Sequence, residues 1–142
     1  MPVTSAAVSV HSRFKNLELR DPYNLVGIAR KGVKPKVFYD FAEIIKMSER
    51  SLAGIINLSS RTLSNYKEQQ KSLEPTFSEH LLKLILLFEK GEAVFGNIDE
   101  FNYWLKKPFW NAKERPLDWL VTPGGVDLLI KELEKLAQGY PV

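Results

Sequence analysis

Apolar residues recur along this chain at the spacing of helices. In residues 37–46 they follow a period close to 3.6, which predicts an amphipathic helix. Residues 52–56 carry a second apolar face, and residues 77–95 carry a third that is much denser. No segment shows the alternation of apolar and polar residues that marks a half-buried strand. The pattern therefore predicts an all-α fold.

Residues that favour helix ends divide this pattern into elements. Serine, threonine and proline are typical of helix starts, and glycine is typical of the position after a helix. The expected boundary residues are Pro22, Gly32, Ser48, Ser59, Gly96, Thr122 and Gly139. Thr76 and Glu79 have the spacing of a capping box, which predicts that the dense apolar helix begins there.

Residues 48–70 predict two short helices joined by a tight turn, which is the pattern of a helix-turn-helix. Asn57 tolerates the left-handed backbone of such a turn, and Leu63 and Tyr66 point back between the helices. The rest of the second helix is polar, and the first turn of such a helix meets base edges in a major groove. The residues expected to contact DNA are Ser60, Arg61, Thr62, Ser64, Asn65 and Lys67. Residues 22–75 are thus predicted to form a DNA-binding domain.

The charge distribution favours the same half of the chain. Residues 1–75 carry 12 Lys and Arg against 7 Asp and Glu, whereas residues 76–142 carry 8 against 10. A positive surface suits contact with phosphates. Residues 1–21 have no sustained apolar period, so we expect a flexible N-terminal arm. His11, Arg13 and Lys15 either contact phosphate or belong to a solvated tail, and we favour the tail.

The long helix predicted within residues 76–97 has more apolar residues than one face can bury in a small domain. Two arrangements explain this excess. In the first, which we favour, the helix also forms a twofold dimer interface, as DNA-binding proteins with two half-sites commonly do. In the second, it is the central helix of a monomer. The residues expected at the dimer interface are Leu82, Ile85, Leu86 and Phe88.

Composition excludes several classes of site. The 142 residues include no cysteine and two histidines, which rules out a disulfide framework and argues against a metal centre. No glycine-rich phosphate loop or catalytic constellation occurs, so we expect neither an enzyme nor a cofactor. Gly124 and Gly125 lie at a predicted helix start, where close packing is favoured over anion binding. The lack of a membrane span or signal segment predicts a cytoplasmic protein.

Aromatic residues gather near the predicted C-terminal domain, residues 98–142. Phe109, Trp110 and Trp119 are surrounded by Lys, Asn and Arg, which is the composition of an interface hot spot. These tryptophans alternatively complete the core of a small domain. We favour the core for Trp104 and Trp119, and the interface for Trp110, because it lies in a loop between prolines.

The order of the segments adds a resemblance that extends from about Leu25 to Tyr140. The motifs that carry it are Arg61-Thr62-Leu63, Phe95-Gly96, Trp104-Leu105 with Pro108 and Asn111, Pro116-Leu117-Asp118 with Leu120, and Thr122, Gly124 and Gly139. With these motifs the chain resembles the Xre/MbcA/ParS family of antitoxins, which neutralise RES-domain toxins in bacterial type II toxin-antitoxin systems. It departs from the family at Ala112-Lys113, where a glycine pair is usual, and at His80, where an arginine is expected.

The resemblance implies an Xre-like DNA-binding domain, a small helical toxin-binding domain and a homodimer. RES toxins consume NAD, and the antitoxin blocks their active site while the complex represses its own promoter at operator DNA. The residues that the resemblance and the aromatic cluster together assign to toxin binding are Phe109, Trp110, Asn111, Gly139, Tyr140, Pro141 and Val142. The alternative is a stand-alone transcription regulator whose C-terminal domain dimerises or senses a small ligand.

Overall fold

The computed structural model describes residues 8–109 and 113–139, and every regular element within these ranges is a helix. The prediction of an all-α fold is confirmed for them. In chain order the elements are α1 (Val10–Phe14), η2 (Lys15–Leu17), α2 (Pro22–Lys31), α3 (Pro35–Ile44), α4 (Glu49–Ile55), α5 (Ser60–Glu68), α6 (Pro75–Phe95), α7 (Ile98–Lys106), η3 (Pro116–Val121) and α8 (Pro123–Ala137).

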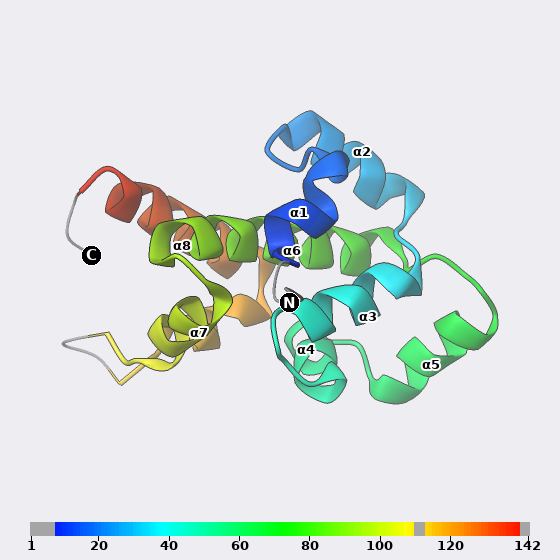
Figure 1. Ribbon diagram of the computed structural model, residues 1–142. Coiled ribbons are helices and arrows are strands. Elements are labelled where there is room, and N and C mark those ends of the chain that lie inside the picture. Colours follow the sequence, from blue (N-terminus) through cyan, green and yellow to red (C-terminus); the bar gives the residue numbers. More distant parts are fainter. Residues whose placement is uncertain (1–7, 110–112, 140–142) are drawn as a thin grey trace, which may run out of the picture.

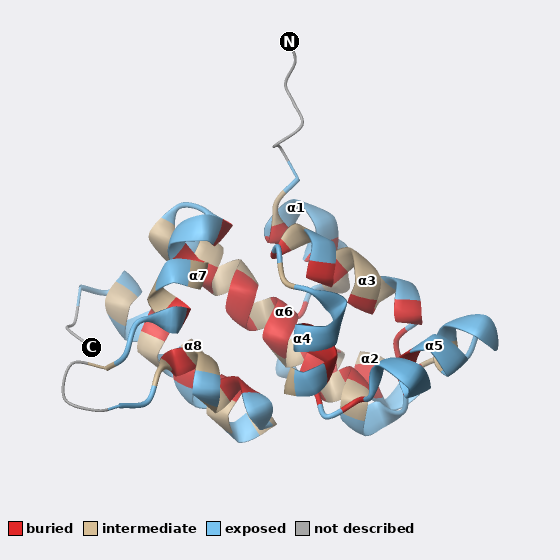
Figure 2. Cartoon of the chain, turned by 90° about the horizontal axis from the view of Figure 1, so that it is seen from below, coloured by how far each residue is buried: buried red, intermediate tan, exposed pale blue. Residues whose placement is uncertain are grey.

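The long helix α6 lies at the centre of the molecule. The helices α1, α2, α7 and α8 all pack against it, so its middle is enclosed by the chain (Figures 1 and 2). At Gly91 the packing is so close that a Cβ atom would lie 2.5 Å from the ring of Phe101. Although α6 has 21 residues, no helix within residues 8–109 and 113–139 is long and apolar enough to cross a membrane.

The apolar excess of α6 is buried within one chain, which corrects our interpretation of that excess. Leu82, Ile85 and Phe88 are at most 1% exposed, and Leu86 is half-buried. The side chains expected to meet a second copy therefore already contact neighbouring helices. In the structure α6 is a central helix, as in the second of the two arrangements. A homodimer remains a prediction, but these three side chains do not offer it a free surface.

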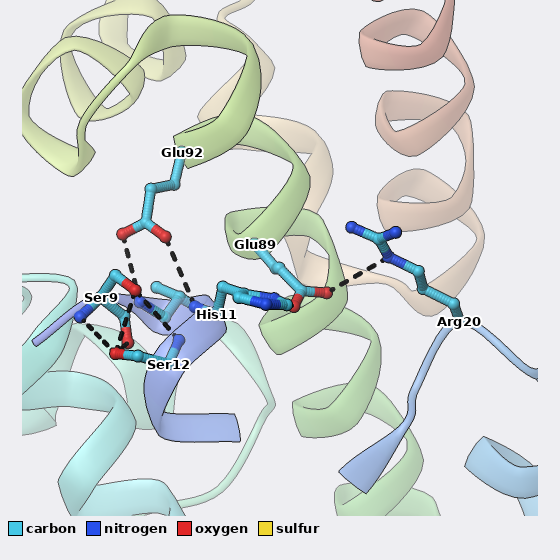
Figure 3. Close-up of polar contacts among 7 residues, drawn as sticks. Ser9, His11, Ser12, Arg20, Glu89 and Glu92 are labelled. Carbon is cyan, nitrogen blue, oxygen red and sulfur yellow. Dashed lines mark hydrogen bonds and ion pairs between the residues drawn. The ribbon is translucent and has the colours of Figure 1, made fainter. Parts of the chain in front are cut away.

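The segment before α2 is ordered, which corrects the expectation of a flexible arm for residues 8–21. Val10 and Phe14 of α1 are buried against α6, and the ring of Phe14 contacts Phe41 edge-on at 6.1 Å between centroids. The carboxylate of Glu92 accepts hydrogen bonds from the backbone N–H groups of Val10 and His11, at 3.1 and 3.4 Å (Figure 3). Residues 1–7 lie outside the described residues.

Two of the three basic residues singled out in this segment, His11 and Arg13, contact carboxylates, whereas Lys15 is exposed. Nδ1 of His11 lies 2.6 Å from a carboxylate oxygen of Glu89 (Figure 3). The guanidinium of Arg13 donates to Asp40 at 2.6 Å. Neither side chain belongs to a solvated tail, because both attach α1 to the neighbouring helices.

Most predicted helix boundaries occur where the sequence placed them. The hydroxyls of Ser48, Ser59 and Thr122 each accept a backbone N–H from the first turn of the following helix. Glycines at the helix ends have positive φ, namely Gly32 (86°), Gly96 (95°) and Gly139 (86°). The capping box at Thr76 is wrong, because α6 begins at Pro75 with Glu74 as N-cap. Proline has no N–H to satisfy at the first helical position, so α6 starts there without a side-chain cap.

Candidate nucleic-acid interface

The polar face of α5 is fully open to solvent. The residues predicted to contact DNA are all exposed, namely Ser60, Arg61, Thr62, Ser64, Asn65 and Lys67. Leu63 is 2% exposed and Tyr66 is half-buried, so the opposite face of α5 holds it on the protein. Figure 1 shows α5 at the edge of the molecule, at the end away from α7 and α8.

The connection from α4 to α5 fixes this orientation. Asn57 has a φ of +61°, the left-handed conformation expected for it, and the chain reverses direction there. Leu58 follows as a buried residue whose N–H donates to the carbonyl of Ala53 at 2.9 Å. Ala53 is itself 2% exposed, so a larger side chain has no room at this crossing.

Thr62 takes part in the cap of α5. Its backbone N–H donates to the hydroxyl oxygen of Ser59 at 3.0 Å, and its own hydroxyl oxygen accepts from that hydroxyl at 2.8 Å. A capped helix start holds the first turn in register. Thr62 therefore positions Arg61, whose side chain projects from the same turn.

Positive charge around α5 is not compensated by nearby carboxylates. Within residues 8–109 and 113–139, Arg61, Lys67, Lys34 and Lys71 have no carboxylate oxygen within 4.0 Å. The ammonium of Lys67 instead lies 4.7 Å from the ring centroid of Tyr39. Uncompensated cations on one exposed surface suit a polyanion.

Some lysines on the other side of the molecule are paired, whereas Lys106 and Lys131 form no ion pair within the described residues. Lys83 lies 2.9 Å from Asp127 and 3.5 Å from Glu79, and Lys90 lies 3.4 Å from Glu134. These pairs join α6 to α8 or to its own next turn.

The carboxylate of Asp40, on α3, is bound by two cations. Lys36 and Arg13 donate to its Oδ2 at 2.7 and 2.6 Å. Burial alone would raise the pKa of Asp40, but the hydrogen bonds and charges of these two cations outweigh it and lower the pKa below its usual value. A permanently charged Asp40 between two cations leaves a net positive group.

The C-terminal residues assigned to a partner are only partly described. Phe109 is half-buried, and its ring lies 5.5 Å from that of Trp119. The N–H of Phe109 donates to the carbonyl of Glu114 at 3.0 Å, which closes the aromatic loop at its base. Gly139 is exposed. The other residues of this prediction lie outside the described residues, namely Trp110, Asn111, Tyr140, Pro141 and Val142.

Two tryptophans pack as core residues, as favoured above. Trp104 is half-buried and stacks on Phe101, with 6.0 Å between ring centroids. The backbone of Trp119 lies close to the start of α8: a Cβ atom at Gly125 would lie 1.9 Å from the backbone carbonyl oxygen of Trp119. The glycine is therefore needed for close packing, which is the reading that the sequence favoured over an anion site.

His80 stands where the family pattern has an arginine, but the sequence did not predict that its side chain is buried. It is 4% exposed on α6, and its Nε2 lies 2.8 Å from the carbonyl oxygen of Leu120. Burial lowers the pKa of His80, assisted by the charge of Lys83 and opposed by this hydrogen bond. A neutral ring that donates through Nε2 thus ties α6 to η3. A single histidine within an apolar run was the available signal.

No protein-family model and no curated protein matches this chain.

Proposed function

We propose that this chain is a DNA-binding repressor that also acts as the antitoxin of a RES-domain toxin. The observation that carries the DNA-binding part is the exposed polar face of α5, where Arg61 and Lys67 have no carboxylate partner among residues 8–109 and 113–139. The opposite face of the same helix is anchored by Leu63. A helix held in this way presents side chains to base edges without losing its own packing.

In this proposal α4, the connection at Asn57 and α5 are a helix-turn-helix, and α5 is its recognition helix. Arg61 lies in the first turn, where an arginine side chain forms two hydrogen bonds to a guanine. Asn65, one turn later, has the amide that pairs with adenine. Lys67 lies about 9 Å further along the helix axis than Arg61, given a rise of about 1.5 Å per residue. At that distance it reaches the phosphates that border the groove.

The antitoxin part rests on the family resemblance and on the position of the aromatic loop. The helix α7, which Phe109 follows in the chain, lies at the end of the molecule away from α5 (Figure 1). The two ends are thus free to bind different partners at once. We place the RES toxin against the loop and the tail, and operator DNA against α5, in a cytoplasmic homodimer.

The DNA-binding part is tested with the full chain and the DNA upstream of its own gene. We expect Arg61→Ala to weaken operator binding by about 1–3 kcal/mol and to relax the base preference at one position. Lys67→Ala is expected to weaken binding equally on every sequence. If Arg61→Ala also weakens all sequences equally, Arg61 contacts a phosphate and the assignment of base reading to it is wrong.

The antitoxin part is tested by co-expression with the product of the neighbouring reading frame. We expect a stoichiometric complex in which deletion of residues 139–142 together with Trp110→Ala restores toxicity. The Tyr103→Ala variant is the control, because Tyr103 is an aromatic exposed elsewhere on this end of the chain. Operator binding without any co-purifying toxin would instead favour the stand-alone regulator.

A further inference from the structure

We infer that the groove between the start of α3 and the end of α5 binds a backbone phosphate of the DNA, beside the bases that α5 reads. This inference rests on the proposed function, because it names a second contact of the same DNA interface. It assigns phosphate binding to Lys34 and Lys36, which no sequence pattern singled out.

The groove has a volume of about 510 Å³ and a lining rich in hydrogen-bond donors. Its lining residues are Lys34, Pro35, Lys36, Tyr39, Asp40, Lys67 and Gln70. All three lysines are exposed, and the phenol and the amide add two further donor groups. Lysine, tyrosine and glutamine are among the side chains that contact phosphate oxygens in protein–DNA complexes.

The charge of the groove selects an anion. Three lysines line it against one carboxylate, that of Asp40, which is also bound by Arg13 from outside the lining. A cationic ligand would therefore meet repulsion, and an apolar ligand would leave three ammonium groups with fewer water contacts. The ammonium of Lys67 is held over the ring of Tyr39, which fixes one side of the groove.

The backbone around the groove is held in place, so its lysines project from a fixed frame. The N–H of Leu73 donates to the carbonyl of Val33 at 2.8 Å, and the N–H of Val33 donates to the hydroxyl of Ser78 at 3.0 Å. Gly32 has a φ of +86°, and a Cβ atom there would lie 2.5 Å from the carbonyl oxygen of Leu73. The chain before α3 is thus fixed against the chain after α5.

The position of the groove suits a duplex rather than a free anion. Lys67 lies in the last turn of α5 and Gln70 two residues after it, whereas Arg61 lies in the first turn. A major groove is about 12 Å wide, so a helix that reads bases near its start reaches the bordering phosphates near its end. Lys34 and Lys36 then extend that contact from α5 to α3.

The experiment is a salt titration of DNA binding by the full chain. The Lys34→Gln/Lys36→Gln variant is compared with Lys106→Gln/Lys131→Gln, which removes the same charge from exposed positions on α7 and α8. Each lost phosphate contact lowers the slope of log K against log salt by about 0.9. We expect the groove variant, which loses one phosphate contact, to lose about 0.9 of that slope, equally on operator and unrelated DNA, and the control variant to keep the wild-type slope.

Inorganic phosphate, titrated by calorimetry, distinguishes a free anion from the DNA backbone. An unchanged DNA slope in the groove variant would overturn the inference while leaving the proposed function intact. Phosphate binding that needs the two lysines, together with an unchanged DNA slope, would assign the groove to a free anion and also overturn it. A wild-type chain that binds no DNA would instead show that the proposed function itself is wrong.

Discussion

The side-chain amide of Asn57 donates a hydrogen bond to the backbone carbonyl of Val121 across 3.3 Å. This contact joins the connection before α5 to η3, the element that follows the aromatic loop. The preceding carbonyl, that of Leu120, accepts from His80 of α6. Adjacent carbonyls of η3 thus contact both the connection before α5 and the central helix α6.

Substitutions at Asn57 separate its backbone role from its hydrogen bond. Asn57→Gly keeps a residue that tolerates positive φ and removes the amide, so we expect a loss of less than about 1 kcal/mol in the free energy of unfolding. Asn57→Ala removes both, and the left-handed backbone costs it about 1 kcal/mol more. Urea unfolding of the two variants measures the difference. Equal losses would mean that the φ of +61° is not a source of strain.

His80 predicts a pH dependence of stability. Its pKa is lowered from 6.5 in the folded chain, so the unfolded chain binds the proton at higher pH. The stability that the neutral ring provides is therefore present above pH 6.5 and is lost as the pH falls through the folded pKa. We expect the urea midpoint to fall on acidification from pH 7 to 5, and to fall less in His80→Gln, whose amide can still donate to Leu120.

The difference between the pH profiles of wild type and His80→Gln reports on His80, because the other lowered pKa values belong to carboxyl groups. Asp40 and Asp118 have pKa values below 3.8, so the stability they add is lost at lower pH than this range. Parallel pH profiles for wild type and His80→Gln would contradict the prediction.

Adjacent glycines at the start of α8 give a matched pair of variants. At Gly125 a Cβ atom would lie 1.9 Å from the carbonyl oxygen of Trp119, and a backbone atom cannot move aside as a flexible side chain can. We expect Gly125→Ala to destabilise the chain by about 1–3 kcal/mol. At Gly124 a Cβ atom meets nothing within 4 Å, so Gly124→Ala should be neutral or slightly stabilising in a helix. Thermal unfolding of Gly125→Ala and Gly124→Ala measures which variant is the less stable.

A matched pair of variants also tests whether α1 is packed on the rest of the chain. Phe14 is 8% exposed in contact with Phe41, so Phe14→Ala should cost about 3 kcal/mol in the free energy of unfolding. Tyr23 is 91% exposed, and Tyr23→Ala should change the free energy of unfolding by less than about 0.5 kcal/mol. A similar small change in both variants would show that α1 is an arm after all.

Local signals in the sequence predicted much of this fold. Ser48 and Ser59 cap their helices through residues three positions away, and the positive φ of Asn57 is a local property of the turn, so these features were visible without knowledge of the rest of the chain. The exposed face of α5 followed from the buried position of Leu63. Such features depend on one helix or one turn.

Long-range contacts explain the two main errors. The helix α1 has five residues, too few to show a helical period, and its order comes from Glu89 and Glu92, about 80 positions away. The helices α1, α2, α7 and α8 together cover α6, and the sequence shows the apolar excess of α6 but not which distant segments cover it. The groove at Lys34 was missed for the same reason, since it forms where two distant segments meet.

The most direct test of the central claim is the ratio of affinities for two DNA duplexes. Fluorescence anisotropy of the full chain, at physiological salt, would compare the duplex upstream of its gene with a scrambled duplex of equal length. If α5 reads bases, the upstream duplex binds at least about 1000-fold more tightly, and Arg61→Ala reduces this ratio. Equal binding of both duplexes by wild type, with no change in Arg61→Ala, would contradict the claim that α5 is a recognition helix.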